Sequence, residues 1–163
     1  PATQPKEKSM SKAEEKLAAL GLELPVAAAP VANYVGFTVS GKTVYISGQL
    51  PFKGGKLLVT GRLGAGVTIE DGYAAGRQCG LNILAHLKAA CGGDLDRVAR
   101  VLRLGGFVNS TPEFTDAPKC VNGASDLMVA VFGDAGRHAR AAVGVASLPA
   151  GAAVEVDAVV ELK

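Results

Sequence analysis

The sequence contains no tryptophan and few other aromatic residues, and only 20% of its residues are charged. Hydrophobic residues make up 48% of the chain, and many of them are small. This composition predicts a compact folded domain with closely packed side chains and excludes a disordered chain. A length of 163 residues fits one domain with a single core.

Metal-ligating residues are scarce. The two histidines, His86 and His138, have no second ligand near them in the sequence, and the three cysteines lack C-x-x-C spacing. We therefore predict no metal site. The odd cysteine count also argues against a disulfide framework and fits a reducing compartment, so we expect the cytoplasm, or the mitochondrial matrix in a eukaryote. The cysteines are Cys79, Cys91 and Cys120.

Long apolar runs are also missing. No stretch approaches the roughly 20 residues needed to cross a bilayer, so no membrane association is expected. Residues 1–16 are polar and rich in lysine without a following apolar segment, which argues against a secretory signal. The stretch Pro1–Ser9 is left out of the fold prediction.

The net charge is only +2, from 17 basic and 15 acidic residues. Nucleic-acid binding usually requires a basic stripe that neutralises phosphates. The nearest candidate is Arg97, Arg100 and Arg103, which alternate with apolar residues. We interpret this stretch as a strand with solvated arginines and expect no nucleic-acid partner.

The first third of the chain predicts a short helix and a hairpin. Residues 11–20 form a helical pattern in which Ser11 can cap the N-terminus. An Ala/Pro-rich connector follows, so residues 1–29 are predicted to be a tail and residues 30–163 one domain. Two β-rich runs between residues 34 and 49 flank Gly41 and predict a β-hairpin. The glycines of residues 51–66 do not match a phosphate-binding motif.

Two longer helices are predicted. The first covers about residues 69–91, with Thr68 as N-cap and Gly92-Gly93 after its end. Its cysteines and His86 are interpreted as core residues. A strand over residues 97–108 separates it from the second helix, which covers about residues 114–132 and has Pro118 in its first turns.

The C-terminal stretch predicts two strands. Apolar residues alternate with acidic ones from Val154 to Leu162, and residues 140–146 form a second strand pattern. With a turn at residues 148–151, we expect an antiparallel hairpin that places Arg140 opposite Asp157 on one face. The element order predicts an α+β fold, with one sheet and both helices packed on one face. The other face, carrying Ala142 and Gly144, is expected to be buried against another subunit.

Four segments in this order resemble the Rid (YjgF-like) family. The resemblance implies a chorismate-mutase-like fold of the bacillus type. It also implies a homotrimer with a central barrel and three sites in the clefts between subunits. The similar segments are PVANYV, VYISGQLPF, VNGASDLMVAVFG and HARAAVGVASLPAGAAVEVDAVV.

The resemblance also implies roles for individual residues. It makes Arg140 the substrate-binding arginine and Asp157 the acidic site residue. The remaining substrate-binding positions would be Tyr34, Ser47, Gly48, Asn122 and Ala142. Three departures stand out: Ala142 replaces the cysteine of the archetypal deaminases, Asp157 replaces a commoner glutamate, and Gly144 replaces another glutamate. They bear on reaction and substrate more than on fold.

Each site residue also has a structural interpretation. Arg140 offers a planar fork of donors suited to a carboxylate, but it could equally form an interface salt bridge with Asp157 or Glu155. Asp157 could orient a water or simply pair with Arg140. Tyr34 could cover the substrate or be a strand-edge aromatic, and Asn122 could be a helix-surface residue.

The resulting hypothesis is an imine/enamine hydrolase that converts small 2-imino acids to 2-oxo acids plus ammonia. An imine is already electrophilic, so positioning and one acid–base group suffice without a cofactor. The first alternative is a non-enzymatic relative that binds a small carboxylate or a protein partner. A second, less favoured alternative is RNA cleavage, for which neither histidine has an evident partner.

Overall fold

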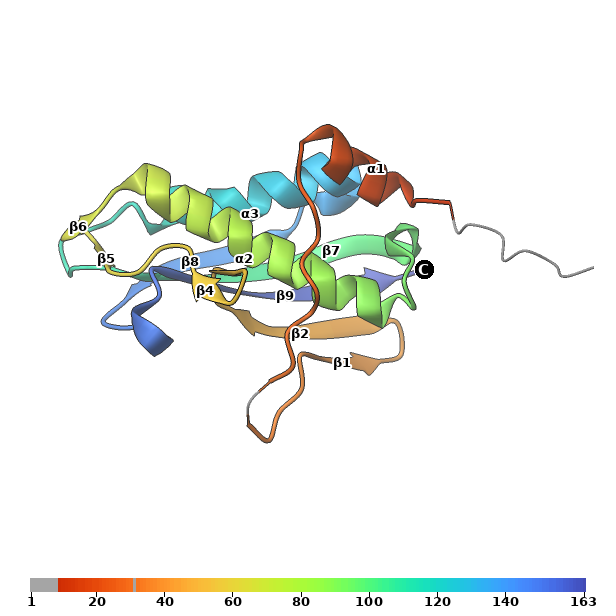
Figure 1. The fold of residues 1–163 in the computed structure, drawn as a ribbon, viewed down its shortest axis with the longest axis horizontal. Helices are drawn as coiled ribbons and strands as arrows, with labels where there is room; N and C mark the ends of the chain where they lie inside the picture. Colours follow the sequence, from red (N-terminus) through yellow and green to blue (C-terminus); the bar gives the residue numbers. More distant parts are fainter. Residues whose placement is uncertain (1–8, 31) are drawn as a thin grey trace, which may run out of the picture.

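The computed structural model describes residues 9–30 and 32–163, so residues 1–8 of the predicted tail and Val31 of the PVANYV segment lie outside the described residues. Two long helices cover one face of a five-stranded sheet (Figure 1). The helices are α1 (Lys12–Ala19), α2 (Ile69–Ala90) and α3 (Ala117–Phe132), with short 3₁₀ turns η1 (Leu95–Arg97), η2 (Gly133–Gly136) and η3 (Pro149–Gly151). The strands are β1 (Phe37–Ser40), β2 (Thr43–Gln49), β3 (Phe52–Lys53), β4 (Lys56–Leu57), β5 (Arg62–Leu63), β6 (Gly66–Val67), β7 (Val98–Asn109), β8 (Ala139–Val145) and β9 (Val154–Leu162).

The predicted local elements are confirmed. Ser11 caps α1 and Thr68 caps α2, each accepting a hydrogen bond from the backbone N–H three residues later. Pro118 lies in the first turn of α3. The hairpin of β1 and β2 turns at Gly41, whose φ of 59° suits glycine. Between β2 and α2 the chain forms only the two-residue strands β3 to β6.

The main sheet has the order β1-β2-β9-β7-β8, in which β7 and β8 are parallel and the other pairs are antiparallel. The predicted hairpin between residues 140–146 and the C-terminal strand is therefore wrong. Because α3 carries the chain back across the sheet, β8 returns parallel to β7, as helical crossovers do. The final strand β9 then fills the space between β2 and β7.

This order places Arg140 and Asp157 on opposite faces. Arg140 pairs across the strands with Leu104, which is fully buried beneath the helices. Asp157 pairs with Gly105, the next residue of β7. Since successive residues of a strand point to opposite faces, Arg140 faces the helices and Asp157 faces away from them. The predicted shared face is wrong.

Ala142 and Gly144 also lie on the helix side, in contrast to the prediction. Both share a face with Arg140 because they follow it at even spacing along β8. Ala142 packs against the hydrophobic core, and Gly144 approaches Ser110. The helix-free face instead carries the exposed side chains of Tyr45 and Val143.

The core lies between the sheet and α2 and α3, and α1 contributes to it. Ala13 and Leu17 of α1 are almost fully buried in the same cluster as the helix and sheet residues. Figure 1 shows the connector that follows α1 (residues 20–30) running across α2. No helix in the described part of the chain is long and apolar enough to span a membrane.

Candidate functional site

The first group of predicted site residues lies where β8 meets α3. Arg140 of β8 donates from Nη1 to Asn122 Oδ1 at 2.7 Å and to Ser125 Oγ at 3.1 Å. Both acceptors belong to α3, one helical turn apart. Among the described residues, no carboxylate lies within ion-pair distance of Arg140. The structure thus brings Arg140 and Asn122 together and leaves the arginine charge uncompensated.

A histidine extends this group. Ser125 Oγ lies 2.8 Å from His138 Nε2, and His138 Nδ1 lies 2.7 Å from the Gly136 carbonyl oxygen. A carbonyl only accepts, so Nδ1 carries the proton and a neutral ring accepts from the Ser125 hydroxyl at Nε2. The hydroxyl can then accept from Arg140. We name Asn122, Ser125, His138 and Arg140 the arginine cluster.

Ser125 and His138 were missed in the sequence, although spacing carries a signal for both. Ser125 follows Asn122 by three residues and so shares its helix face. His138 precedes Arg140 by two residues, as side chains on one face of an extended segment do. Ala142 continues this face of β8 toward the core.

The second group lies on the other side of the sheet, where β2 meets β9. Ser47 donates from its hydroxyl to the Val35 carbonyl at 2.6 Å and from its backbone N–H to the Gly36 carbonyl at 2.9 Å. These bonds hold the backbone next to Tyr34, which is 55% exposed. The pairing of β2 with β9 is irregular between Ile46 and Gln49. A β-bulge at this point changes the direction of the Ser47–Gly48 backbone.

Glu155 of β9 packs directly on this bulge. A Cβ added to Gly48 would lie 3.0 Å from Glu155 Cδ, so glycine leaves space for the carboxyl group. Partial burial, together with the charge of Asp157, raises the pKa of Glu155 above its usual range. We name Tyr34, Ser47, Gly48 and Glu155 the carboxylate cluster.

Asp157 belongs to neither cluster. Its Oδ1 lies 3.6 Å from Arg103 Nη1 on the helix-free face, and both side chains are more than one third exposed. The prediction of a strand with solvated arginines is met for Arg100 and Arg103, which are exposed on β7, whereas the equally exposed Arg97 lies in η1 before the strand begins.

The two clusters do not meet within one chain. They lie on opposite faces of the sheet. In addition, β8 is two strand steps, about 10 Å, from Glu155 on β9 and three steps, about 14 Å, from Ser47 on β2. Within residues 9–30 and 32–163, no group of three His, Cys, Asp or Glu side chains is placed to hold a metal ion. Burial raises the pKa of the Cys120 thiol to about 11, and the other two cysteines are also buried.

Comparisons with known proteins agree with this architecture. The chain is 56% identical over 144 residues to Protein TCP17 of Trypanosoma cruzi, covering 88% of this chain and 89% of that protein. Its fold matches Atu1372 of Agrobacterium tumefaciens, a protein described as of unknown function, with a TM-score of 0.89 and 51% identity over 93% of both chains. RidA from an Antarctic Psychrobacter is 28% identical over 83% of this chain and 94% of its own, with a TM-score of 0.57.

A family-wide match covers almost the whole chain. The sequence pattern described as "YjgF/chorismate_mutase-like, putative endoribonuclease" matches residues 14–162, from the middle of α1 to the end of β9. The match and the relatives agree with the resemblance seen in the sequence. The chain belongs to the YjgF/chorismate-mutase-like family.

Proposed function

We propose that this protein hydrolyses small 2-imino acids to 2-oxo acids and ammonia, with Arg140 binding the substrate carboxylate. The observation that carries the proposal is the partly buried guanidinium of Arg140, which contacts two neutral acceptors and, among the described residues, no carboxylate. Such a group is matched to a planar anion that it can bind through two parallel hydrogen bonds. The family relation to a protein named RidA supports the same reaction class.

The chemistry requires one acid–base group and a water molecule. A carboxylate accepts a proton from the water as its oxygen adds to the carbon of the protonated imine, which gives a neutral tetrahedral carbinolamine. The same group returns that proton to the nitrogen, and the C–N bond breaks to release ammonia. The former water oxygen then loses its remaining proton, which leaves the 2-oxo acid. Glu155 suits this role because its raised pKa brings it closer to the working pH.

Asp157, expected from the sequence to be the acid, remains the second candidate. Its side chain is 39% exposed, and its Oδ1 lies 3.6 Å from Arg103 Nη1. A carboxylate that already contacts an arginine is less free to contact a water molecule and the departing amine. Glu155 has no arginine partner among the described residues, so it is the favoured acid–base group.

A complete site is proposed to form between subunits of a homotrimer. The arginine cluster and the carboxylate cluster are too far apart in one chain to hold one small substrate, so each site would combine clusters from two copies. The helix-free face supports this assembly because Tyr45 and Val143 are 52% and 47% exposed there. They lie on β2 and β8, near opposite edges of the sheet, so an interface that covers both would span this face.

The test is turnover of 2-iminopropanoate, generated in situ by an amino-acid oxidase acting on alanine. We expect wild-type protein to accelerate imine loss and Arg140→Ala to abolish that acceleration. Arg77→Ala, which removes an exposed arginine outside both clusters, should retain activity. Light scattering on each variant reports whether the oligomer is intact.

Paired carboxylate variants separate the two acid candidates. Glu155→Gln should lower kcat far more than Asp157→Asn if Glu155 transfers the proton, and the reverse result would assign the role to Asp157. Wild-type activity in Arg140→Ala would refute the proposed site.

A binding function without turnover is the second candidate. It is favoured by Ala142, which places a methyl group against the core where the archetypal deaminases carry a thiol. A rise in Tm with pyruvate, lost in Arg140→Ala and not accompanied by hydrolysis of any imino acid, would establish it.

A further inference from the structure

A groove separate from both clusters lies on the outer side of α2. It has a volume of about 460 Å³, within the range of small-molecule sites. Three segments line it: the connector at residues 21–25, the hairpin of β3 and β4, and the α2 positions from Ala74 to Leu81. We name it the connector groove.

Hydrogen bonds fix the hairpin wall of the groove against α2. Gln78 Nε2 donates to the Phe52 carbonyl at 3.1 Å, and Asn82 Nδ2 donates to the Phe52 and Leu50 carbonyls at 3.0 and 2.9 Å. Gln78 is 6% exposed, so its bonds are well shielded from water. The hairpin therefore cannot move relative to α2 without breaking these bonds.

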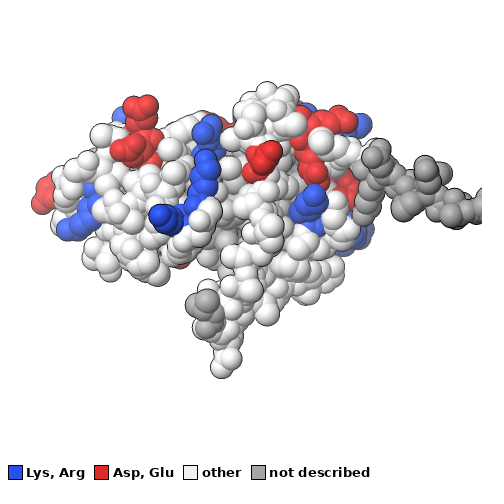
Figure 2. Space-filling view, in the orientation of Figure 1, with Lys and Arg blue, Asp and Glu red and all other residues white. Residues whose placement is uncertain are grey.

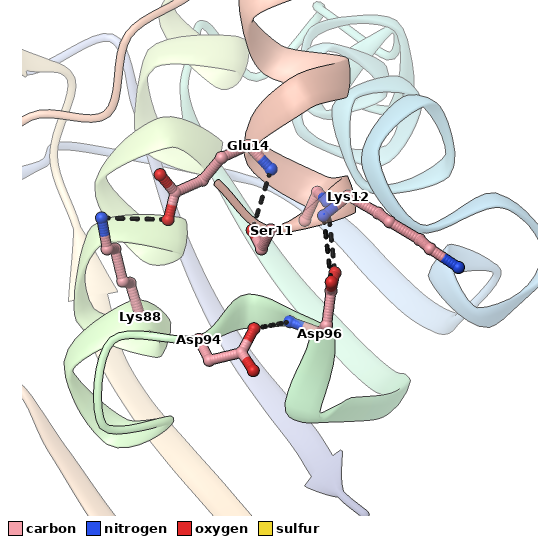
Figure 3. Close-up of polar contacts among 7 residues, drawn as sticks. Ser11, Lys12, Glu14, Lys88, Asp94 and Asp96 are labelled. Atoms are coloured by element: carbon pink, nitrogen blue, oxygen red, sulfur yellow. Dashed lines mark hydrogen bonds and ion pairs between the residues drawn. The ribbon is translucent and has the colours of Figure 1, made fainter. Parts of the chain in front are cut away.

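The opposite wall is fixed through α1. Figure 3 shows Asp96 accepting from the backbone N–H of Lys12, and Lys88 of α2 bonded to Glu14 at 2.9 Å. The connector leaves α1 through a bond from the Leu22 N–H to the Leu17 carbonyl at 2.9 Å. With both walls fixed, the groove is formed before any ligand arrives.

Part of the groove wall is apolar. Leu22 and Leu24 of the connector pack against the core, and Leu81 of α2 is buried beneath them. Leu58 of the hairpin side remains 45% exposed. Such walls favour a hydrocarbon segment, because contact removes apolar surface from water.

The rim of the groove is cationic. Lys53 and Arg77 line it from the hairpin and from α2, both are exposed, and neither forms an ion pair within the described residues. Figure 2 shows a blue column of Lys and Arg side chains over the middle of α2, bordered by white surface. The one lining carboxylate, Glu23, is exposed and pairs with neither cation. The uncompensated charge selects an anionic occupant.

We propose that the connector groove binds a monomeric amphiphilic carboxylate, a small molecule with an aliphatic chain and one anionic end. The chain would lie against Leu22, Leu24 and Leu81, and the carboxylate would contact Lys53 and Arg77. Because neither cation belongs to the arginine or carboxylate cluster, this binding is independent of imine hydrolysis.

Calorimetric titration of the full chain with decanoate, below its micellar concentration, tests the proposal. We expect one decanoate per chain and binding about tenfold weaker in Lys53→Gln/Arg77→Gln, since two partly solvated charge contacts are lost. Leu58→Asp should weaken binding through charge repulsion. The matched control Lys16→Gln/Lys42→Gln removes the same charge from exposed positions outside the groove and should bind as wild type.

Three outcomes would overturn the proposal. One is no decanoate binding by wild type, and another is equal binding by wild type and Lys53→Gln/Arg77→Gln. The third is loss of binding in Arg140→Ala with retention in Lys53→Gln/Arg77→Gln, which would move the ligand to the arginine cluster. Decanol, which lacks the charge, should bind wild type and the double variant equally.

Discussion

Arg140 Nη1 and Asn122 Oδ1 are joined by a 2.7 Å hydrogen bond that links the edge strand β8 to α3. The bonds to Asn122 and Ser125 use the same arginine nitrogen. A guanidinium has five N–H donors in a plane, so Nε and Nη2 remain to form a two-point contact with a carboxylate. Asn122 therefore orients the arginine without neutralising it.

Replacing Asn122 by aspartate should place a competing carboxylate beside Arg140. We expect Asn122→Asp to lower kcat/KM for 2-iminopropanoate by about tenfold to a hundredfold, as hydrogen bonds to charged groups contribute about 1.5–3 kcal/mol. Asn122→Ala removes the orienting bond without adding charge and should lose less. Steady-state kinetics of the two variants measure the difference. Equal kinetics in Asn122→Asp and wild type would show that Arg140 does not bind the substrate.

Glu155 should make the protein less stable at neutral pH. Burial raises the pKa of Glu155 in the folded state above its value in the unfolded chain. The folded state therefore loses stability as pH rises from the unfolded-state pKa through the folded-state pKa. The cost is absent at low pH, where both states are protonated. Glu155→Gln should therefore raise Tm at pH 7 by about 1–2 °C, a small effect because the side chain is half solvated.

The pH profile distinguishes this effect from a change in packing. The Tm difference between Glu155→Gln and wild type should shrink as pH falls from neutral toward about 4, the ordinary range for glutamate, and should be absent below it. Glu161→Gln serves as the matched control, because it removes an exposed carboxylate from the same strand. A constant Tm difference across pH would rule out ionisation as its cause.

Local elements of the fold were predictable because their signals are short-range. The caps at Ser11 and Thr68 and the alternation of Val154–Leu162 appear in the structure as the sequence indicates. Strand pairing was not predictable in the same way. The turn at residues 148–151 favoured a hairpin, but β8 instead pairs with β7 across a helix, and nothing local in the sequence encodes that choice.

The site residues were likewise predictable only where strand pairing was not needed. Arg140 and Asn122, which family resemblance named, do lie together. The expected contact between Arg140 and Asp157 failed because it depended on the wrong strand pairing. Glu155 was considered only as a salt-bridge partner, since its contact with Gly48 depends on a bulge that spacing alone does not show.

Close packing of α2 on α3 makes Gly123 intolerant of a side chain. A Cβ there would collide with the Tyr73 carbonyl oxygen and lie 2.7 Å from the Arg77 backbone nitrogen. We expect Gly123→Ala to lower the free energy of unfolding by about 1–3 kcal/mol, as overpacking does. An unobstructed helix position shows the opposite preference, with alanine favoured over glycine by about 1 kcal/mol.

The exposed α2 residue Ala89 provides the control for that preference. Ala89→Gly should lose about 1 kcal/mol through helix propensity alone. Urea denaturation of both variants gives the two values. If Gly123→Ala were as stable as wild type or more so, the two helices would have to be able to separate at this point.

Asp96 should control whether α1 stays folded against the domain. Its two carboxylate oxygens accept from the backbone N–H groups of Lys12 and Ala13 at 3.0 and 3.3 Å (Figure 3). The first N–H groups of a helix have no partner within it, and a helix of eight residues is too short to be stable alone. Asp96→Ala should cost about 1 kcal/mol, or roughly 2–4 °C in Tm.

Amide hydrogen exchange shows which residues lose stability in Asp96→Ala. In Asp96→Ala the amides of residues 12–24 should exchange faster, while those of β7 and β9 keep their protection, because only α1 and the connector lose their anchor. Glu14→Ala removes the partly exposed ion pair with Lys88 and should have a smaller effect. Unchanged protection of residues 12–24 in Asp96→Ala would show that burial of Ala13 and Leu17 alone holds α1 in place. It would also remove Asp96 from the set of contacts that keep the connector groove open.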